Sequence, residues 1–142
     1  MNVADSERLG TALEQLGLHS VSEANEADVI VVNSCVVRQS AEDKVTGTLA
    51  AMRPLKRQGP RRLVALMGCL VGSKTEELRR RFPHVDVFMR PQQFGPLLDL
   101  VGERLGLDWE RCIASLAPNR PGVACYVPII HGCDLMCTFC II

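Results

Sequence analysis

Three short apolar runs alternate with segments of helical periodicity, and this alternation limits the fold more than any other feature of the chain. The runs cover residues 28–33, 62–67 and 85–89. The first, Asp-Val-Ile-Val-Val-Asn, is almost entirely β-branched, as expected of a strand that is buried on both faces. Helical patterns cover the segments 4–16, 40–56, 73–81 and 91–103. The sequence therefore predicts an α/β domain with a parallel sheet.

Local signals refine the helix starts and mark the end of this domain. Ser40 with Asp43, and Ser73 with Glu76, have the spacing of capping boxes. Pro91 suits the first turn of the last helix. The alternation stops after residue 105, and the stretch Ala-Pro-Asn-Arg-Pro-Gly within residues 106–121 predicts a linker. Residues 123–130 then predict a new strand.

Composition excludes several classes of function. The 142 residues carry no net charge, so global charge gives no case for nucleic-acid binding, and with only 4% aromatics no stacking platform for single strands is visible. No apolar run is long enough to cross a bilayer, and the N-terminus lacks a signal peptide. We therefore expect a cytoplasmic protein with no membrane partner. There, seven cysteines, an odd number, favour metal or redox chemistry over disulfides.

Three of the cysteines form a Cys-x3-Cys-x2-Cys run, Cys133, Cys137 and Cys140, directly after the predicted strand at 123–130. Thiolates this close in one loop can bind three irons of a 4Fe–4S cluster and leave the fourth iron open. An open iron can chelate S-adenosylmethionine and reduce its sulfonium, which releases a 5′-deoxyadenosyl radical. Phe139 could pack against the adenine of that cofactor. The position at the carboxyl end of a strand is typical of α/β-barrel active sites.

A structural zinc site is the alternative for this run. Structural zinc prefers four ligands arranged as paired Cys-x2-Cys knuckles. The run offers three cysteines, and no second knuckle follows it. The spacing therefore favours an iron–sulfur cluster.

Two further cysteines, Cys35 and Cys69, each directly follow a predicted buried strand. Carboxyl ends of parallel strands meet at one edge of a sheet, where ligands bind, so these thiols could converge there. Small buried residues at strand ends fit the same spacing equally well. A cluster also needs a third ligand, which residues 1–110 do not offer. Cys112, near the linker, and Cys125, inside a strand, are interpreted as structural.

Five motifs in order resemble the methylthiotransferase family of radical S-adenosylmethionine enzymes. They are Asn-Ser-Cys-Val-Val-Arg (33–38), Ala-Glu-Asp-Lys (41–44), Gly-Cys (68–69), Pro-Gln (91–92) and Gly-Cys-Asp-Leu-Met-Cys-Thr-Phe-Cys (132–140). The likeness covers nearly the whole chain. It is strongest to the MiaB branch, which adds a methylthio group to C2 of N6-isopentenyladenosine at position 37 of tRNA.

This resemblance implies a flavodoxin- or Rossmann-like N-terminal methylthiotransferase domain at residues 1–105. A linker at 106–121 and the first strand and cluster loop of a radical S-adenosylmethionine α/β barrel at 122–142 would follow. The implied cofactors are S-adenosylmethionine and two 4Fe–4S clusters, one at the triplet and an auxiliary one. The implied partners are tRNA and an electron donor such as flavodoxin or ferredoxin.

The resemblance also accounts for the missing third ligand. Cys35 and Cys69 match two of the three cysteines that hold the family's auxiliary cluster, and the first would precede Met1. The chain is therefore expected to be an incomplete, inactive piece. Two departures from the family pattern fall close to this site: the stretch Leu-Val-Gly at 70–72 and Arg90 before the Pro-Gln motif.

Two alternatives to the tRNA function remain open at this point. One is the sister branch that methylthiolates an aspartate of a ribosomal protein, although Val37 and Arg38 favour the tRNA branch. The other is a non-catalytic zinc or iron–sulfur module. Two groups of basic residues add little evidence for tRNA binding. They could contact tRNA phosphates, but an interpretation as solvated ends of helices fits them better. These groups are Arg53, Lys56, Arg57, Arg61 and Arg62, and Arg79, Arg80 and Arg81.

Overall fold

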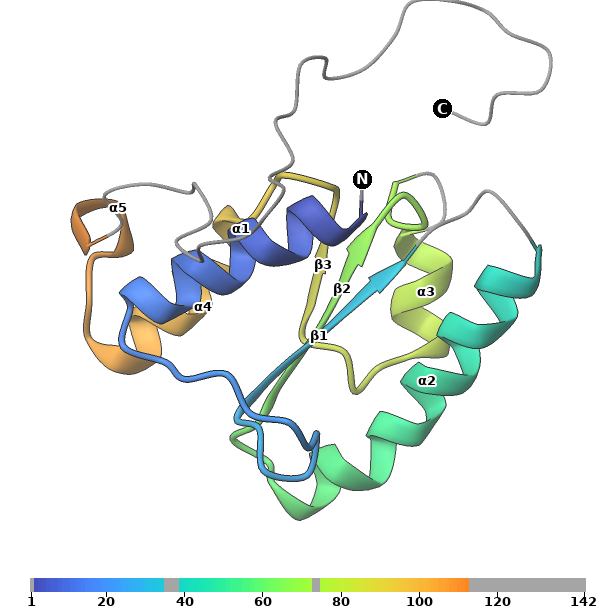
Figure 1. The fold of residues 1–142 in the computed structure, drawn as a ribbon. Coiled ribbons are helices and arrows are strands. Elements are labelled where there is room, and N and C mark those ends of the chain that lie inside the picture. The colour runs from blue at the N-terminus through green and yellow to red at the C-terminus, as the bar shows by residue number, and fades with distance from the viewer. Residues whose placement is uncertain (1, 35–38, 73–74, 113–142) are drawn as a thin grey trace, which may run out of the picture.

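A computed structural model of the chain describes residues 2–34, 39–72 and 75–112 (Figure 1). Its elements in order are α1 (Asn2–Gln15), β1 (Val29–Ser34), α2 (Gln39–Gln58), β2 (Leu63–Gly68), α3 (Thr75–Arg81), β3 (Val87–Met89), α4 (Gly95–Leu105) and α5 (Trp109–Cys112). The strands form one parallel sheet in the order β1-β2-β3. The predicted α/β domain with a parallel sheet is confirmed. The predicted strand at 123–130 lies outside the described residues.

Strand β2 separates two apolar cores. Its residues Leu63, Ala65 and Met67 pack with side chains of α1 and α4, whereas Val64 and Leu66 pack with side chains of α2 and α3. Figure 1 shows the two pairs of helices on opposite faces of the sheet. All six residues of β2 are buried, which explains why its sequence is a continuous apolar run.

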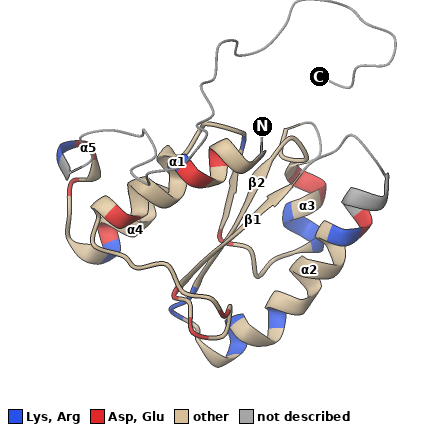
Figure 2. Cartoon of the chain, viewed as in Figure 1, with Lys and Arg blue, Asp and Glu red and all other residues tan. Residues whose placement is uncertain are grey.

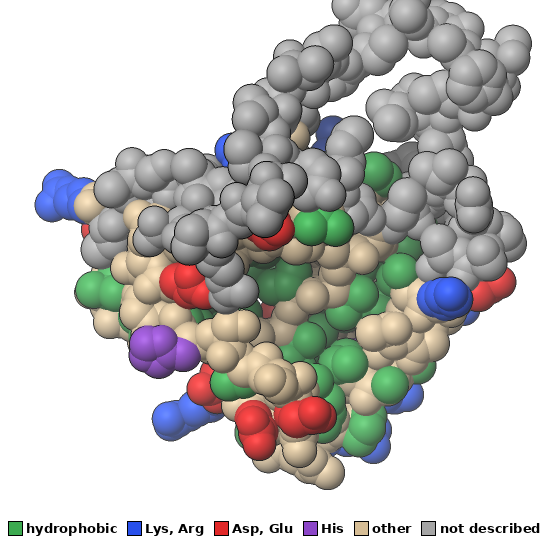
Figure 3. Space-filling view, in the orientation of Figure 1, with side chains coloured by type: hydrophobic (Ala, Val, Ile, Leu, Met, Phe, Trp, Pro, Cys, Tyr) green, Lys and Arg blue, Asp and Glu red, His purple; other side chains and the backbone are tan. Residues whose placement is uncertain are grey.

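Strand β1 lies at one edge of the sheet and is covered less completely. Five of its six residues are half-buried, although the sequence predicted full burial on both faces. Figure 3 shows apolar side chains at the surface of this side of the molecule. Among the helices of the described residues, none is long and apolar enough to cross a membrane.

The predicted helix start at Pro91 is wrong, because α4 begins four residues later at Gly95. Gln92 has a φ of 64°, and the N–H of Gln93 donates to the carbonyl of Arg90 at 3.2 Å, so this stretch forms a turn. Pro96 takes the place in the first helical turn that was expected for Pro91.

The residues just after α4 pack back onto it. Trp109 Nε1–H donates to Asp99 Oδ1 at 2.6 Å. Gly102 allows this approach, because a Cβ there would lie 2.7 Å from the carbonyl oxygen of Leu107 and 3.5 Å from the Trp109 ring. The first part of the segment predicted as a linker is thus a helical turn fixed to α4.

The start of α3 is held by a residue that the capping signal did not identify. Thr75 Oγ1 accepts the N–H of Gly72 and donates to the carbonyl of Gly72, both at 3.0 Å. Ser73 of the predicted capping box lies outside the described residues, as does the side chain of Ser40. The basic residues of α3 gather in its last turn, as predicted (Figure 2).

Two residues of the basic stretch bind within the protein. Lys56 Nζ donates to Asp86 Oδ2 at 2.7 Å and to the carbonyl of Arg62, while Asp86 Oδ2 also accepts the N–H of Val64 at 2.8 Å. Arg62 in turn donates to the carbonyl of Ala27 at 2.6 Å. These bonds tie the end of α2 to the amino ends of the strands.

The remaining basic residues of that stretch, Arg53, Arg57 and Arg61, have exposed side chains. The interpretation as a solvated helix end holds for them. It is wrong for Lys56 and Arg62, because each of these side chains binds a partner elsewhere in the domain.

Replacing Asp86 by Ala is expected to lower the free energy of unfolding by about 1–2 kcal/mol, because Lys56 and the Val64 N–H lose a shared acceptor. Urea denaturation followed by circular dichroism measures this. Glu23→Ala, at an exposed turn residue, is the control and should change stability by less than about 0.5 kcal/mol. Equal effects of the two substitutions would contradict the structural role of Asp86.

Two glycine-to-alanine substitutions should act with opposite sign. Gly68 has a φ of 121°, and a Cβ there would lie 2.1 Å from the Ser34 carbonyl oxygen, so Gly68→Ala should cost at least about 2 kcal/mol. Gly47 lies within α2, and a Cβ added there would meet nothing within 4 Å, so Gly47→Ala should stabilise by about 0.5–1 kcal/mol. Thermal denaturation of both variants tests the pair, and a stable Gly68→Ala variant would refute the close approach.

Candidate functional site

The carboxyl ends of β1 and β2 lie side by side. Their ladder runs from Val29 opposite Leu63 to Ser34 opposite Gly68. Ser34 directly precedes Cys35, which lies outside the described residues, and Gly68 directly precedes Cys69. The sheet register therefore places side by side the two residues, Ser34 and Gly68, that directly precede the predicted ligands Cys35 and Cys69.

Gly68 and Ser34 allow the two strand ends to approach closely. A side chain at position 68 would collide with the backbone of Ser34, and the positive φ of Gly68 turns the chain there. The hydroxyl of Ser34, which is 1% exposed, donates to the carbonyl of Met67 at 3.0 Å. The Gly-Cys motif thus combines a position that only glycine can fill with a cysteine that follows at once.

Cys69 is exposed at the start of a turn whose later residues are buried. The N–H of Val71 donates to the carbonyl of Gly68 at 3.0 Å and closes this turn. Leu70 and Val71 pack into the core formed with α2 and α3. The apolar pair after Cys69 therefore anchors the turn, while Cys69 itself is exposed at the carboxyl end of β2.

The two departures from the family pattern are neighbours in space. A Cβ added at Gly72 would lie 3.8 Å from Nε of Arg90, which is ordinary van der Waals contact. Arg90 directly follows β3, so its guanidinium reaches the turn that follows Cys69. No signal in the sequence linked these two positions.

The start of α1 also reaches this edge of the sheet. Asn33 Nδ2–H donates to Ser6 Oγ at 2.9 Å, which joins the first turns of α1 to the last residues of β1. Asp5, on the same helix, is only 6% exposed. Figure 1 shows α1 starting at the edge where β1 and β2 end. Spacing alone gave no reason to place Ser6 at the site.

Most of the predicted ligands fall beyond what the structure describes. Cys35, Cys133, Cys137, Cys140 and Phe139 all lie outside the described residues. Within residues 2–34, 39–72 and 75–112, no group of three or more His, Cys, Asp or Glu side chains could hold a metal ion. Cys69 is the predicted ligand that the described part contains.

Comparison with known proteins gives matches over the whole chain. The family described as "Uncharacterized protein family UPF0004" matches residues 1–90. Similar proteins named tRNA-2-methylthio-N(6)-dimethylallyladenosine synthase occur in Dehalococcoides mccartyi, at 41% identity, and in Roseiflexus sp., at 38% identity. Another with this name, from Herpetosiphon aurantiacus, is 36% identical.

Each of these three alignments covers 100% of this chain but only 30–33% of the relative. The chain thus spans about a third of the length of the relatives that it matches. The family match covers more than half of the chain and includes both strand ends at the site, at Ser34 and Gly68. The chain therefore belongs to the UPF0004 family, and the resemblance to MiaB-type methylthiotransferases is confirmed.

Proposed function

We propose that this chain belongs to a radical S-adenosylmethionine methylthiotransferase that modifies tRNA. The reaction would add a methylthio group to C2 of N6-isopentenyladenosine at position 37. The names of the relatives support this proposal, since they describe a 2-methylthio product in tRNA. Dimethylallyl in these names is another word for the isopentenyl group on N6 of the adenosine.

The observation that carries the proposal is the pairing of Ser34 with Gly68 at the carboxyl end of the sheet. Neighbouring strands lie about 4.8 Å apart, and consecutive Cα atoms are about 3.8 Å apart, so the Cα atoms of Cys35 and Cys69 can be separated by roughly 12 Å at most. Two thiols within this distance can serve one polynuclear centre. Buried structural cysteines are a poorer interpretation, because Cys69 is exposed.

The donor set fits an iron–sulfur centre. Cys69 offers a soft sulfur ligand at an accessible edge, where the absence of a Cβ at Gly68 leaves room for the chain to turn. Cys35 and Cys69 would hold the auxiliary 4Fe–4S cluster together with a third ligand from elsewhere. Cys133, Cys137 and Cys140 would hold the second cluster, with Phe139 against the adenine of S-adenosylmethionine.

When bound, the triplet cluster supplies the electron that cleaves S-adenosylmethionine, and the auxiliary cluster supplies the sulfur. The described residues provide the frame for the auxiliary site. Gly68 and Ser34 bring the strand ends together, and Leu70 and Val71 hold the turn that presents Cys69. An electron donor such as flavodoxin or ferredoxin would serve the triplet. The proposed division into residues 1–105, 106–121 and 122–142 assigns the auxiliary cluster to the first segment and the triplet cluster to the last.

Anaerobic reconstitution with iron and sulfide tests the triplet. The chain should gain a brown absorbance that shifts when S-adenosylmethionine is added, with about four irons bound per cluster. Cys137→Ala should abolish the shift, whereas Cys112→Ala, at a cysteine interpreted as structural, should retain it. Stoichiometric zinc without iron would instead identify a zinc module and reject the enzyme function.

A second prediction separates the roles of the two clusters. In the protein that carries tRNA activity, Cys69→Ala should stop transfer of the methylthio group while cleavage of S-adenosylmethionine continues. Mass spectrometry of tRNA nucleosides and of 5′-deoxyadenosine measures the two steps. The Cys112→Ala variant should keep both. If Cys69→Ala retained normal methylthio transfer, the assignment of Cys69 would be wrong, and a modified aspartate in a ribosomal protein would point to the sister branch.

A further inference from the structure

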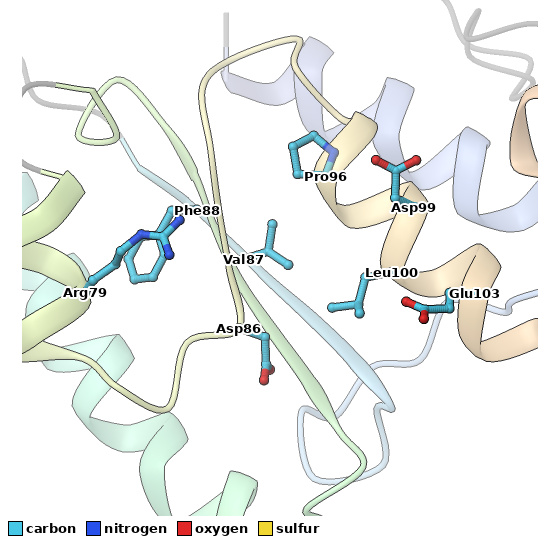
Figure 4. Close-up of a pocket in the computed structure, with 8 residues that line it drawn as sticks. All are labelled: Arg79, Asp86, Val87, Phe88, Pro96, Asp99, Leu100 and Glu103. Atoms are coloured by element: carbon cyan, nitrogen blue, oxygen red, sulfur yellow. The ribbon is translucent and has the colours of Figure 1, made fainter.

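A groove of about 310 Å³ runs along the outer edge of β3, on the opposite side of the sheet from the exposed edge of β1. Figure 4 shows Arg79 and Phe88 on one side of β3 and the α4 residues Pro96, Asp99, Leu100 and Glu103 on the other. Val87 lies between them. The groove is thus bordered by one helix from each face of the sheet.

The floor of the groove is the outer edge of β3, with which no other strand of the described residues pairs. The N–H of Asp86 donates to the carbonyl of Val64 on β2 at 2.8 Å. The N–H of Leu63 faces β1 and the carbonyl of Val64 faces β3, so the register that sets Val87 opposite Ala65 and Met89 opposite Met67 directs the backbone groups of Val87 and Met89 toward β2. The N–H and carbonyl of Phe88, between them, point toward the open edge. An extended peptide could pair with these groups as an added strand.

The walls offer apolar contacts on both faces of such a strand. Phe88 and the guanidinium of Arg79 stack 5.5 Å apart on one wall. Leu100 and Pro96 form the other wall. In a strand added between the two walls, successive side chains would point to opposite walls. Apolar side chains of that strand would suit at least one of the two walls.

The charge of the groove is negative where it is not already balanced. Asp86 is paired with Lys56, and Arg79, the cation that lines the groove, lies 4.0 Å from a carboxylate oxygen of Glu76. Among the described residues, neither Asp99 nor Glu103 has a cationic partner, since Asp99 accepts a hydrogen bond from the neutral Trp109 side chain. Both carboxylates lie on the α4 side (Figure 4). This edge would repel the phosphates of RNA and attract a basic side chain.

The fold argues against the segment directly after α4 as the occupant. The crossovers β1–α2–β2 and β2–α3–β3 use helices on one face and advance from β1 toward β3. Helix α4 lies on the other face. A crossover of the same hand through α4 would return toward β1, so it would leave the outer edge of β3 open.

From these observations we infer that the groove along β3 is a docking site for an extended segment of another polypeptide, in which lysine or arginine alternates with apolar residues. The added strand would pair with the backbone of Phe88, and its basic side chains would lie beside Asp99 and Glu103. This inference goes beyond the proposed function and does not depend on either cluster.

The test uses the 142-residue chain and a fluorescein-labelled peptide of alternating lysine and valine. Fluorescence anisotropy should show saturable binding that weakens as salt rises. The peptide of alternating glutamate and valine should not bind. A lysine–valine peptide that is N-methylated at every residue should bind poorly, because neither of its edges can then donate hydrogen bonds to β3. Absence of binding by the unmodified lysine peptide, or equal binding by the N-methylated one, would overturn the inference.

Charge reversal locates the site. Glu103→Lys should weaken binding of the lysine peptide about fivefold or more and should allow the glutamate peptide to bind. Glu110→Lys, at an exposed acidic residue of α5 that does not line the groove, is the matched control and should leave both affinities unchanged. Equal effects of the two substitutions would reject the groove. A dimer without peptide that Glu103→Lys dissociates, seen by sedimentation velocity, would assign the groove to a second copy and would also overturn the inference.

Discussion

Strand β2 contacts both cores of the domain and both neighbouring strands, and its pairing with β1 fixes the place where the site is built. Its six residues are buried, and alternate residues pack with the helices on opposite faces. Its last residue, Gly68, lies against the backbone of Ser34. Because burial on both faces leaves β2 no freedom to slide by one residue, the register at the carboxyl edge is fixed by packing rather than by the site.

Much of this frame could be predicted from the sequence, since continuous apolar runs and helical periodicity are local patterns. The predicted bounds of three elements agree with the structure to within two residues at both ends. These elements are the strands predicted at 28–33 and 62–67 and the helix predicted at 4–16. The start of α4 was wrong because two prolines, Pro91 and Pro96, each suit a first helical turn, and only the left-handed backbone of Gln92 decides between them.

The contacts that join distant parts of the chain could not be predicted. Nothing near Lys56 in the sequence indicates that its partner is Asp86, and nothing near Asn33 indicates that it bonds Ser6. The same holds for Arg90, which reaches Gly72 only after β3 has been laid beside β2. The cysteine pair was predicted because strand ends in a parallel sheet share an edge, but the glycine contact that brings these ends together is visible only in the folded chain.

The anchoring of Trp109 on α4 changes the tether between the two proposed centres. If the chain left the domain at Gly106, the free connection to Cys133 would be longer by the length of residues 106–112, or roughly 24 Å when extended. With α5 held in place, the connection from Cys112 to Cys133 can span roughly 75 Å at most. A shorter tether raises the effective concentration of the cysteine triplet near the N-terminal domain. The hydrogen bond of the Trp109 indole would therefore help to set how often these two parts of the chain meet.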